Sequence, residues 1–241
     1  GDWDTTTTWT NGDVQTIPGS ASLVDPTRTV DWNIVQISSN VTMQNDYPTK
    51  ELPLANNGNR NVLGLIVDNT FELTAEGTTD MTYGTATGNG LTVTHYLGLD
   101  GKIDLEGGSQ LIQSTDSDLV TTATGELERD QQGTASSFNY NYWTSSVGPK
   151  TAGSANPNYT IGDYASNTGV LYDGTSGTPL EIAFSNPYAA ADGAVTSPIT
   201  LSRYWLWKYD DLTHNTYSEW QDINETIPMA PGLGFTMKGV S

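Results

Sequence analysis

Between Ile34 and Leu111, apolar residues recur in pairs two positions apart, and the pairs form three groups within which successive pairs are six residues apart. A period of two places alternate side chains on one face of a β-strand. The pattern therefore predicts short strands that each direct two side chains into a core. The pairs are Val35 and Ile37, Val41 and Met43, Leu65 and Val67, Phe71 and Leu73, Leu91 and Val93, Leu97 and Leu99, and Ile103 and Leu105.

Residues that favour tight turns separate or end these pairs, namely Asp68-Asn69, Asp100-Gly101 and Gly107-Gly108. Gly, Asn and Asp adopt positive φ at low cost. Repetition of strand and turn favours a β-solenoid, in which successive coils stack their backbones as in a parallel β-helix. A β-sandwich of ordinary hairpins stays an alternative, because Asp-Gly between alternating residues also signals a hairpin.

The apolar period fades at residues 131–137, and the following segment is richer in aromatic residues and prolines. Short β-like segments there, separated by turn clusters, predict a small antiparallel β-sandwich. We therefore expect an all-β chain with almost no helix. Residues 1–135 are predicted to form a β-solenoid-like domain with an N-terminal cap, and residues 136–241 an aromatic-rich β-sandwich-like domain. The cap is expected to contain Trp3, Trp9 and Trp32.

Charge and composition exclude several classes of function. The chain has 9 Lys and Arg against 28 Asp and Glu, a formal net charge of -19, which repels phosphate backbones and anionic membranes. It has no cysteine, so a disulfide framework, a thiolate metal site and a cysteine nucleophile are all absent. No apolar run approaches the roughly 20 residues of a membrane-spanning helix. We expect an exported protein that binds no nucleic acid and does not insert into a membrane.

Alternating carboxylates are the only residues that suggest a metal site. Glu126, Glu128 and Asp130 would share one strand face, and Ca²⁺ prefers several oxygen ligands. An ordinary solvated face explains the same spacing. Asp104 and Glu106 form a second set, and clustered carboxylates on a solenoid would also suit a polysaccharide-degrading enzyme. We expect no required cofactor, with Ca²⁺ at Glu126, Glu128 and Asp130 as an open alternative.

Catalytic motifs are missing from the sequence. His95 and His214 are far apart and lack the spacing of a zinc site. There is no Gly-x-Ser-x-Gly sequence of the kind that presents a nucleophilic serine. We therefore expect that the protein is not an enzyme.

Aromatic residues in the second half suggest a binding surface. In the alternating segment 202–209, Trp205 and Trp207 would lie on one strand face, and Trp220 would extend it. Exposed, these three tryptophans would form a platform on which sugar rings can stack. A Trp-rich sandwich core would account for the same residues. The two interpretations differ in whether the tryptophans are exposed.

Several segments carry a resemblance to a known group of proteins. They are residues 101–105 (GKIDL), 109–113 (SQLIQ), 128–134 (ERDQQGT), 140–143 (YNYW), 185–188 (SNPY) and 231–239 (PGLGFTMKG). Together they resemble large secreted surface proteins of the Bacteroidetes, which are exported by type IX secretion. The resemblance implies a long, adhesin-like protein with a solenoid, sandwich modules and a downstream sorting domain. It implies no catalytic residues.

These observations predict a non-catalytic structural and adhesive module at the bacterial cell surface. The chain begins at Gly1 without a leader and ends shortly after the strand-like Phe235–Met237, so we expect a segment of a longer extracellular protein. Its expected partners are other modules of that chain and an extracellular glycan or surface protein, with self-assembly left open. The alternatives are a carbohydrate-binding module and a β-solenoid polysaccharide-degrading enzyme.

Overall fold

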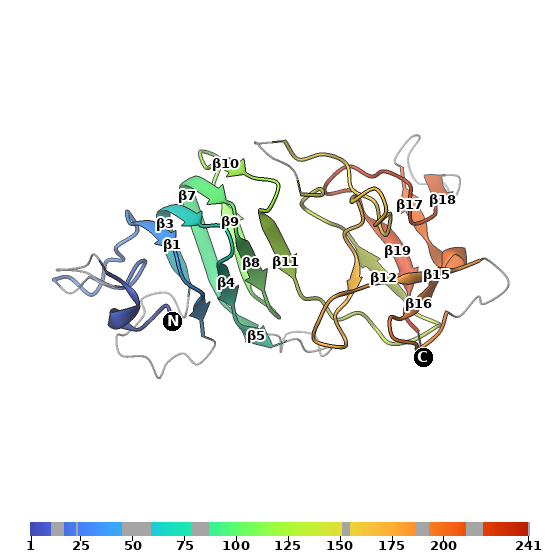
Figure 1. Ribbon diagram of the computed structural model, residues 1–241, viewed down its shortest axis with the longest axis horizontal. Coiled ribbons are helices and arrows are strands. Elements are labelled where there is room, and N and C mark those ends of the chain that lie inside the picture. Colours follow the sequence, from blue (N-terminus) through green and yellow to red (C-terminus); the bar gives the residue numbers. More distant parts are fainter. Residues whose placement is uncertain are drawn as a thin grey trace. The chain divides into compact units, whose positions relative to one another are not determined.

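A computed structural model describes residues 1–10, 17–22, 24–44, 59–78, 87–150, 155–186, 193–210 and 219–240. These ranges are all-β, as predicted: they contain strands and two short 3₁₀-helices, and no α-helix (Figure 1). No helix within them is long and apolar enough to cross a membrane.

The chain divides into two units. The first is Gly1–Gln132 with Thr151–Ala155, and the second is Gly133–Lys150 with Asn156–Ser241. The boundary expected from the sequence lies between residues 135 and 136, and the domain type assigned to each part stays a prediction.

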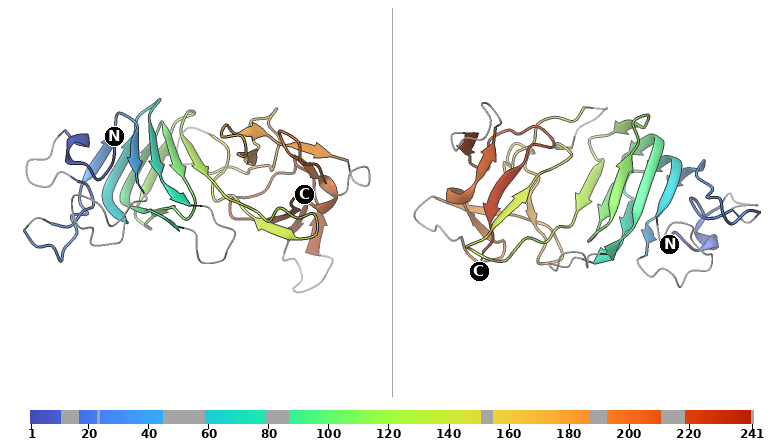
Figure 2. Two further views of the ribbon diagram at one scale, coloured as in Figure 1. Left: turned by 90° about the horizontal axis from the view of Figure 1, so that it is seen from below. Right: turned by 180° about the vertical axis from the view of Figure 1, so that it is seen from behind.

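Two parallel sheets form most of the first unit (Figure 2). One contains β1 (Ile34–Ile37), β3 (Arg60–Val67), β7 (Gly90–Leu99) and β10 (Asp118–Thr121), with β9 (Gln110–Gln113) also paired to β7. The other contains β2 (Val41–Met43), β4 (Glu72–Ala75), β8 (Lys102–Leu105) and β11 (Glu126–Arg129). Along the chain, β1, β3, β7 and β10 each precede a strand of the other sheet. A short antiparallel pair, β5 (Gly77–Thr78) and β6 (Thr87–Gly88), lies beside them.

Stacked aliphatic side chains make the core of the first unit. In register across the first sheet, Val35, Leu65, Leu97 and Leu119 are neighbours. Across the second sheet the corresponding stack is Val41, Leu73, Ile103 and Leu127. The inward orientation predicted for the apolar pairs is confirmed, because every member is buried except Phe71, which is partly buried against the same core.

One long strand replaces two predicted short ones. Leu91 and Val93 belong to β7 together with Leu97 and Leu99, while the exposed His95 lies between the two pairs. The pairing of β3 with β7 shifts register between Val62 and Gly64, which indicates a bulge at this point. Because of the bulge, a single strand directs both apolar pairs into the core although His95, between them, faces solvent.

Two of the predicted turns contain a residue in the left-handed conformation, which is the expected type of residue at only one of them. At the first turn it is Thr70, with φ 71°, that has positive φ, although Asp68 and Asn69 are the residues expected to take it. At the last turn Gly107 has φ 55°, as a glycine there permits. The sequence therefore marks where the chain turns and is less reliable about which residue absorbs the strain.

A buried asparagine connects three successive passages of the chain. The Asn89 side-chain amide donates to the carbonyl oxygens of Met43 (3.0 Å) and Glu76 (2.9 Å). The Asn89 backbone N–H donates to Ser109 Oγ (2.9 Å), and Ser109 in turn donates to the Glu76 carbonyl oxygen (2.8 Å). Buried polar groups require such partners, so this network satisfies backbone carbonyls at the turns.

The N-terminal segment packs onto the core of the first unit. Trp3 is fully buried, donates from Nε1 to the Pro18 carbonyl oxygen (3.0 Å), and meets Trp9 edge to face at 4.9 Å. The predicted role of Trp32 in the cap is wrong, because Trp32 is 65% exposed. The 3₁₀-helix η1 (Thr6–Thr8) lies within this segment, and Asp4 forms a buried ion pair with Arg60 at the start of β3.

Short and mostly antiparallel strands form the second unit. Its largest sheet has the order β12 (Tyr140–Trp143), β19 (Phe235–Lys238), β17 (Trp207–Tyr209) and β18 (Trp220–Asp222), all antiparallel. β13 (Tyr172–Asp173) pairs antiparallel with β14 (Leu180–Glu181), and β15 (Ala183–Ser185) pairs parallel with β16 (Thr200–Ser202). The core includes Tyr159, Ile161, Leu206, Met229, Phe235 and Met237.

The single strand predicted over residues 202–209 is wrong. β16 ends at Ser202, the 3₁₀-helix η2 (Arg203–Trp205) follows, and β17 begins only at Trp207. Ser202 Oγ accepts a hydrogen bond from the Tyr204 N–H (3.3 Å), which caps η2. Trp205 and Trp207 therefore come from different elements and do not share a strand face.

Candidate functional site

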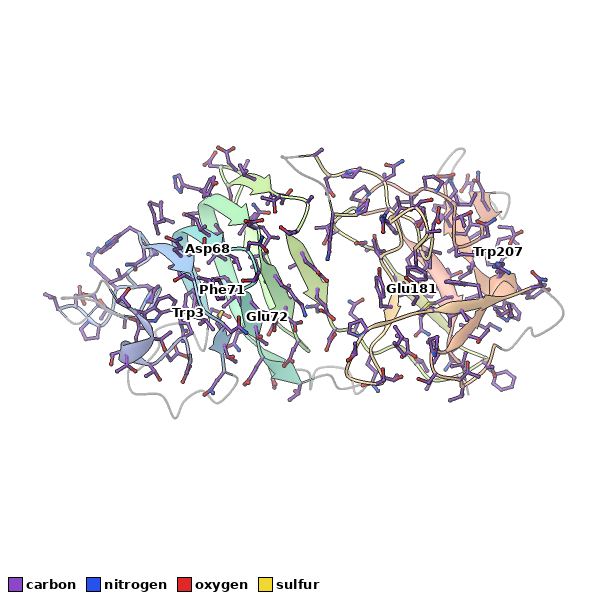
Figure 3. All side chains as sticks on the ribbon, in the orientation of Figure 1. Trp3, Asp68, Phe71, Glu72, Glu181 and Trp207 are labelled. Atoms are coloured by element: carbon purple, nitrogen blue, oxygen red, sulfur yellow. The ribbon has the colours of Figure 1, made fainter. Side chains whose placement is uncertain are left out.

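A ladder of charged side chains follows the solvent face of the second parallel sheet. Register places Glu72, Lys102 and Glu126 in one row across β4, β8 and β11, and Thr74, Asp104 and Glu128 in the next (Figure 3 labels Glu72). The residues that alternate with them point into the core. The strand period thus brings together carboxylates from three passages of the chain.

Lys102 neutralises part of this ladder. Its Nζ lies 3.4 Å from Asp104 Oδ2 and 3.6 Å from Glu72 Oε2, and it also contacts Glu128 Oε2. Burial opposes the charge on Lys102, but the hydrogen bond to Glu128 and the three nearby carboxylates raise the Lys102 pKa well above its ordinary value. The lysine therefore stays charged throughout the physiological range of pH.

Asp104, Glu128 and Asp130 form the carboxylate cluster, in which one oxygen of each lies within 4.8 Å of the others. Burial is the main reason why the pKa of Asp104 is raised to about 6; Lys102 lowers it, and Glu128 raises it again. Asp104 Oδ1 is buried and has no hydrogen-bond partner among the described residues. A carboxyl group with such a pKa can exchange protons near neutral pH. The solenoid-enzyme alternative would therefore depend on Asp104.

The predicted metal ligands come together only in part. Glu128 and Asp130 meet, but Glu126 is not in the carboxylate cluster, and Asp104 from the neighbouring strand takes the third position. The spacing along one strand could not identify Asp104, because its proximity depends on the register of two parallel strands. Carboxylate oxygens suit Ca²⁺, and a bound divalent ion would compete with Lys102 for them. Calcium binding at Glu126, Glu128 and Asp130 stays a prediction.

The other sequence candidates have separate positions. His95 is exposed, and its Nδ1 lies 2.9 Å from Thr94 Oγ1. His214 lies outside the described residues. The five acidic residues considered for a solenoid enzyme do not all gather in the carboxylate cluster. Glu106, for example, is not a member of the carboxylate cluster. Burial raises the pKa of Glu106, and the negative charges of Asp130 and Glu76 raise it further.

The three candidate tryptophans of the second unit lie outside its hydrophobic core cluster. Trp205, Trp207 and Trp220 are each partly exposed, and the core cluster of this unit includes none of them (Figure 3 labels Trp207). Trp207 Nε1 donates to the Tyr204 carbonyl oxygen (3.2 Å), and the Trp220 ring lies 5.3 Å from that of Tyr209. These residues are therefore neither members of the core cluster nor fully exposed, and a sugar-binding platform made of them stays a prediction.

Trp205 belongs to a group of aromatic rings that also includes Tyr140, Tyr142 and Tyr204. Trp205 meets Tyr204 edge to face at 4.5 Å and Tyr140 edge to face at 5.7 Å. Lys238 Nζ lies over the Trp205 ring, 3.4 Å from its centroid. One face of the Trp205 indole is thus occupied by the lysine. Tyr140 and Tyr142 are exposed, at 41% and 70%.

Sequence reasoning missed Tyr140, Tyr142 and Lys238 as site residues. The alternation of Tyr140 and Tyr142 in β12 is a readable signal, because residues two apart share a strand face. The position of Lys238 follows only from the pairing of β12 with β19, in which Tyr140 lies opposite Lys238.

No protein-family model matches the chain, and neither a curated protein sequence nor a solved structure matches it. The assignment of function therefore depends on the arrangement of residues. Two arrangements stand out in the described ranges: the carboxylate cluster on the first unit and the aromatic group with Lys238 on the second.

Proposed function

We propose that the chain is a non-catalytic structural and adhesive module of a longer extracellular protein at a bacterial cell surface. The group of proteins that it resembles, the Bacteroidetes surface proteins exported by type IX secretion, supplies the expected context. In this proposal the first unit is a β-solenoid that acts as a spacer, and the second is a sandwich-like module that carries the contact surface. The partners are neighbouring modules and an extracellular glycan or surface protein, not nucleic acid or lipid.

The observation that carries the proposal is the alternation of consecutive strands between two parallel sheets, with aliphatic residues stacked in register. In such an architecture each coil contacts only its neighbours, so length can grow by adding coils without changing the core. The backbone pairing along the stack makes the array stiff. A stiff element of adjustable length suits a spacer that holds a contact surface away from the cell.

The charged ladder on the first unit also suits a structural role. Lys102 pairs with Glu72, Asp104 and Glu128, which come from its own strand and from both neighbouring strands. Networks of this kind stabilise adjacent strands more than isolated surface ion pairs do. A lysine that links three successive passages of the chain therefore supports cohesion of the stack.

Turnover assays and imaging test this proposal. We expect no cleavage of polysaccharides or peptides by the wild-type chain. Cleavage that the Asp104→Asn variant abolishes would overturn the non-catalytic assignment and favour the solenoid enzyme. Electron microscopy of the native surface particle should show rods of uniform width. Images without such rods would contradict the spacer role.

A carbohydrate-binding module that uses Trp205, Trp207 and Trp220 is the second candidate function. The position of these tryptophans outside the core supports it, because aromatic rings at a surface can stack on sugar rings. A glycan array probed with wild-type protein and with the Trp207→Ala and Trp220→Ala variants tests this function. Binding that both substitutions weaken is expected, and an array without any bound glycan would count against it.

A further inference from the structure

Tyr140 and Tyr142 form an exposed pair of rings at one edge of the largest sheet of the second unit. β12 is the first strand in the order of that sheet and pairs only with β19 among the described strands. The two ring centroids lie 6.5 Å apart with an interplanar angle of 41°. Between them in sequence, Asn141 points inward and is buried. The two tyrosine rings therefore lie on the solvent face of β12, opposite the face that is buried.

Lys238 lies beside this pair and completes a surface of mixed character. Its Nζ is 5.0 Å from the Tyr140 ring centroid and 3.4 Å from that of Trp205. Cation–π contacts of this kind hold an ammonium group in place without removing its charge. Lys238 thus presents a positive charge next to two exposed tyrosine rings.

The lack of a carboxylate partner distinguishes Lys238 from two other basic residues in this unit. Arg203 Nε donates to Glu225 Oε2 (2.6 Å), and Lys208 Nζ lies 2.7 Å from Asp210 Oδ2. Within the described part of the chain, no carboxylate lies within ion-pair distance of Lys238. In a chain with a net charge of -19, the Lys238 ammonium group keeps a positive charge that no neighbouring carboxylate among the described residues neutralises. It is available to an anionic group on a ligand.

The cation is also held by a supported framework. Trp205, whose ring lies under the ammonium group, is the last residue of η2. The buried Thr236 on β19 donates from Oγ1 to the Trp205 carbonyl oxygen (3.1 Å). Lys238 is on the same strand as Thr236, two residues further on. Preorganisation of this kind lowers the entropy lost when a ligand binds.

We propose that Tyr140, Tyr142 and Lys238 form a binding site for a carbohydrate that contains a carboxylated sugar, that is, a uronic acid. The tyrosine rings would contact the apolar faces of the sugars, and Lys238 would donate a hydrogen bond to the carboxylate. Trp205 acts as a positioning residue for Lys238. This inference rests on the carbohydrate-binding function given above as the second candidate, but it places the site on different residues and names the ligand class.

The overall charge of the protein favours this ligand over a polyphosphate. A net charge of -19 repels a dense polyanion at long range, whereas a single carboxylate in contact with an ammonium group is governed by the local contact. Rings next to a cation also select for a ligand with both an apolar face and a negative group. A uronic acid within a polysaccharide has both properties.

Uronic acid oligosaccharides and their methyl esters provide the test, because esterification removes the charge and keeps the sugar. Binding of oligosaccharides that each contain one glucuronate, galacturonate or mannuronate residue to the wild-type chain is measured by calorimetry, alongside the methyl esters. We expect at least one acidic oligomer to bind about tenfold more tightly than its ester, the effect expected for one charge-assisted hydrogen bond. Lys238→Gln should remove this preference. Tyr142→Ala should weaken the binding of both the acid and its ester.

Two matched variants serve as controls. Lys208→Gln removes the same charge from an ion-paired lysine, and Tyr172→Ala removes a tyrosine that is 45% exposed and lies outside the group. Neither should change binding. Thermal unfolding checks that all four variants are folded. We expect Tyr142→Ala to fold, because the Tyr142 side chain is 70% exposed.

Each other result overturns the inference in a recognisable way. If no uronic acid oligomer and no array glycan binds, both the site and the carbohydrate-binding function fail. If glycans bind and only the Trp207→Ala or Trp220→Ala variant loses them, the function stands and the location is wrong. If Lys208→Gln acts like Lys238→Gln, net charge explains the effect. Equal affinity for acid and ester overturns the assigned ligand class.

Discussion

The two units bury their apolar residues in different ways. In the first, aliphatic side chains repeat in register along parallel strands, and Trp3 is the only aromatic residue among the buried members of its core. In the second, strands are short, and the core includes Tyr159 and Phe235, while other aromatic rings stay at the surface. A repeated core can be lengthened without redesign. A core without repeats can support a surface that is present once in the unit, and such a surface is suited to recognition of a ligand.

One arginine–carboxylate ion pair from each unit shows a difference in burial. The ion pair of Asp4 with Arg60 in the first unit has side chains that are 3% and 2% exposed. The pair of Arg203 with Glu225 in the second unit is 27% and 13% exposed. Water screens the second pair more than the first. The following predictions use matched residues from the two units to test whether this contrast has energetic consequences.

The largest effect is expected for the buried tryptophan of the first unit. Trp3→Ala should lower the free energy of unfolding of that unit by about 3–5 kcal/mol, the usual loss for a large buried aromatic residue. Hydrogen exchange of peptides from each unit would measure it, because local stability differs between separate units. Trp32→Ala is the control and should change stability by less than about 0.5 kcal/mol. A small loss for Trp3→Ala would contradict its place in the core of the first unit.

The buried ion pair should be the next most sensitive. Arg60→Met leaves the Asp4 carboxylate without its charged partner inside the first unit, at a cost of about 3 kcal/mol or more. Arg203→Met exposes Glu225 to more solvent, so a loss of about 1–2 kcal/mol is expected in the second unit. Urea unfolding with unit-resolved hydrogen exchange compares them. Equal losses would show that burial does not distinguish the two pairs.

The strands of the first unit are predictable because its pattern repeats. The alternation of Val35 with Ile37 and of Leu97 with Leu99 corresponds directly to inward positions. The pairing of strands is not local information, and it decides which polar residues meet. Asp104 joins Glu128 only because β8 and β11 pair in that register. The predicted set along β11 therefore included Glu126 and missed Asp104.

Prediction was weaker in the second unit, because its sequence has no repeated pattern of apolar pairs. The alternation over residues 202–209 has the strand period, yet Ser202 can also cap a helical turn, and the cap prevails. Tyr140 and Lys238 are distant in sequence and meet across an antiparallel pair. Trp32 shows the same limit in the first unit, because composition alone could not separate it from the buried Trp3.

Buried asparagines give an intermediate effect and occur in both units. Asn89→Ala removes the donor to the carbonyl oxygens of Met43 and Glu76 and should cost the first unit about 2–3 kcal/mol. Among the described residues, the Asn141 side chain forms hydrogen bonds with Thr134 alone, at 2.8 Å and 3.3 Å. Asn141→Ala should therefore cost the second unit about 1 kcal/mol. Thermal unfolding and unit-resolved exchange measure both. The reverse order would contradict the proposal that Asn89 ties three passages together.

The last prediction concerns pH, which should act in opposite directions through Asp104 in the first unit and through Asp173 in the second. Burial raises the pKa of Asp104 from 3.8 to about 6, so its folded form holds a proton that the unfolded chain has lost. The first unit should therefore lose stability as pH rises from about 4 to about 6, by up to about 2 kcal/mol in a partly screened cluster. Asp104→Asn should reduce this slope, and urea unfolding in the presence of a chelator would measure the reduction.

Asp173 gives the opposite sign in the second unit. Burial alone would raise its pKa, but hydrogen bonds from Thr175 and from the Ile199 N–H hold the Asp173 pKa below its ordinary value. Its contribution is present above pH about 4, the unfolded value, and is lost as pH falls through the lower folded pKa. Acidification from pH 6 to 3 should thus first stabilise the first unit and then destabilise the second. Unit-resolved exchange, corrected for the intrinsic effect of pH, separates the two. A common response of both units would contradict the contrast between them.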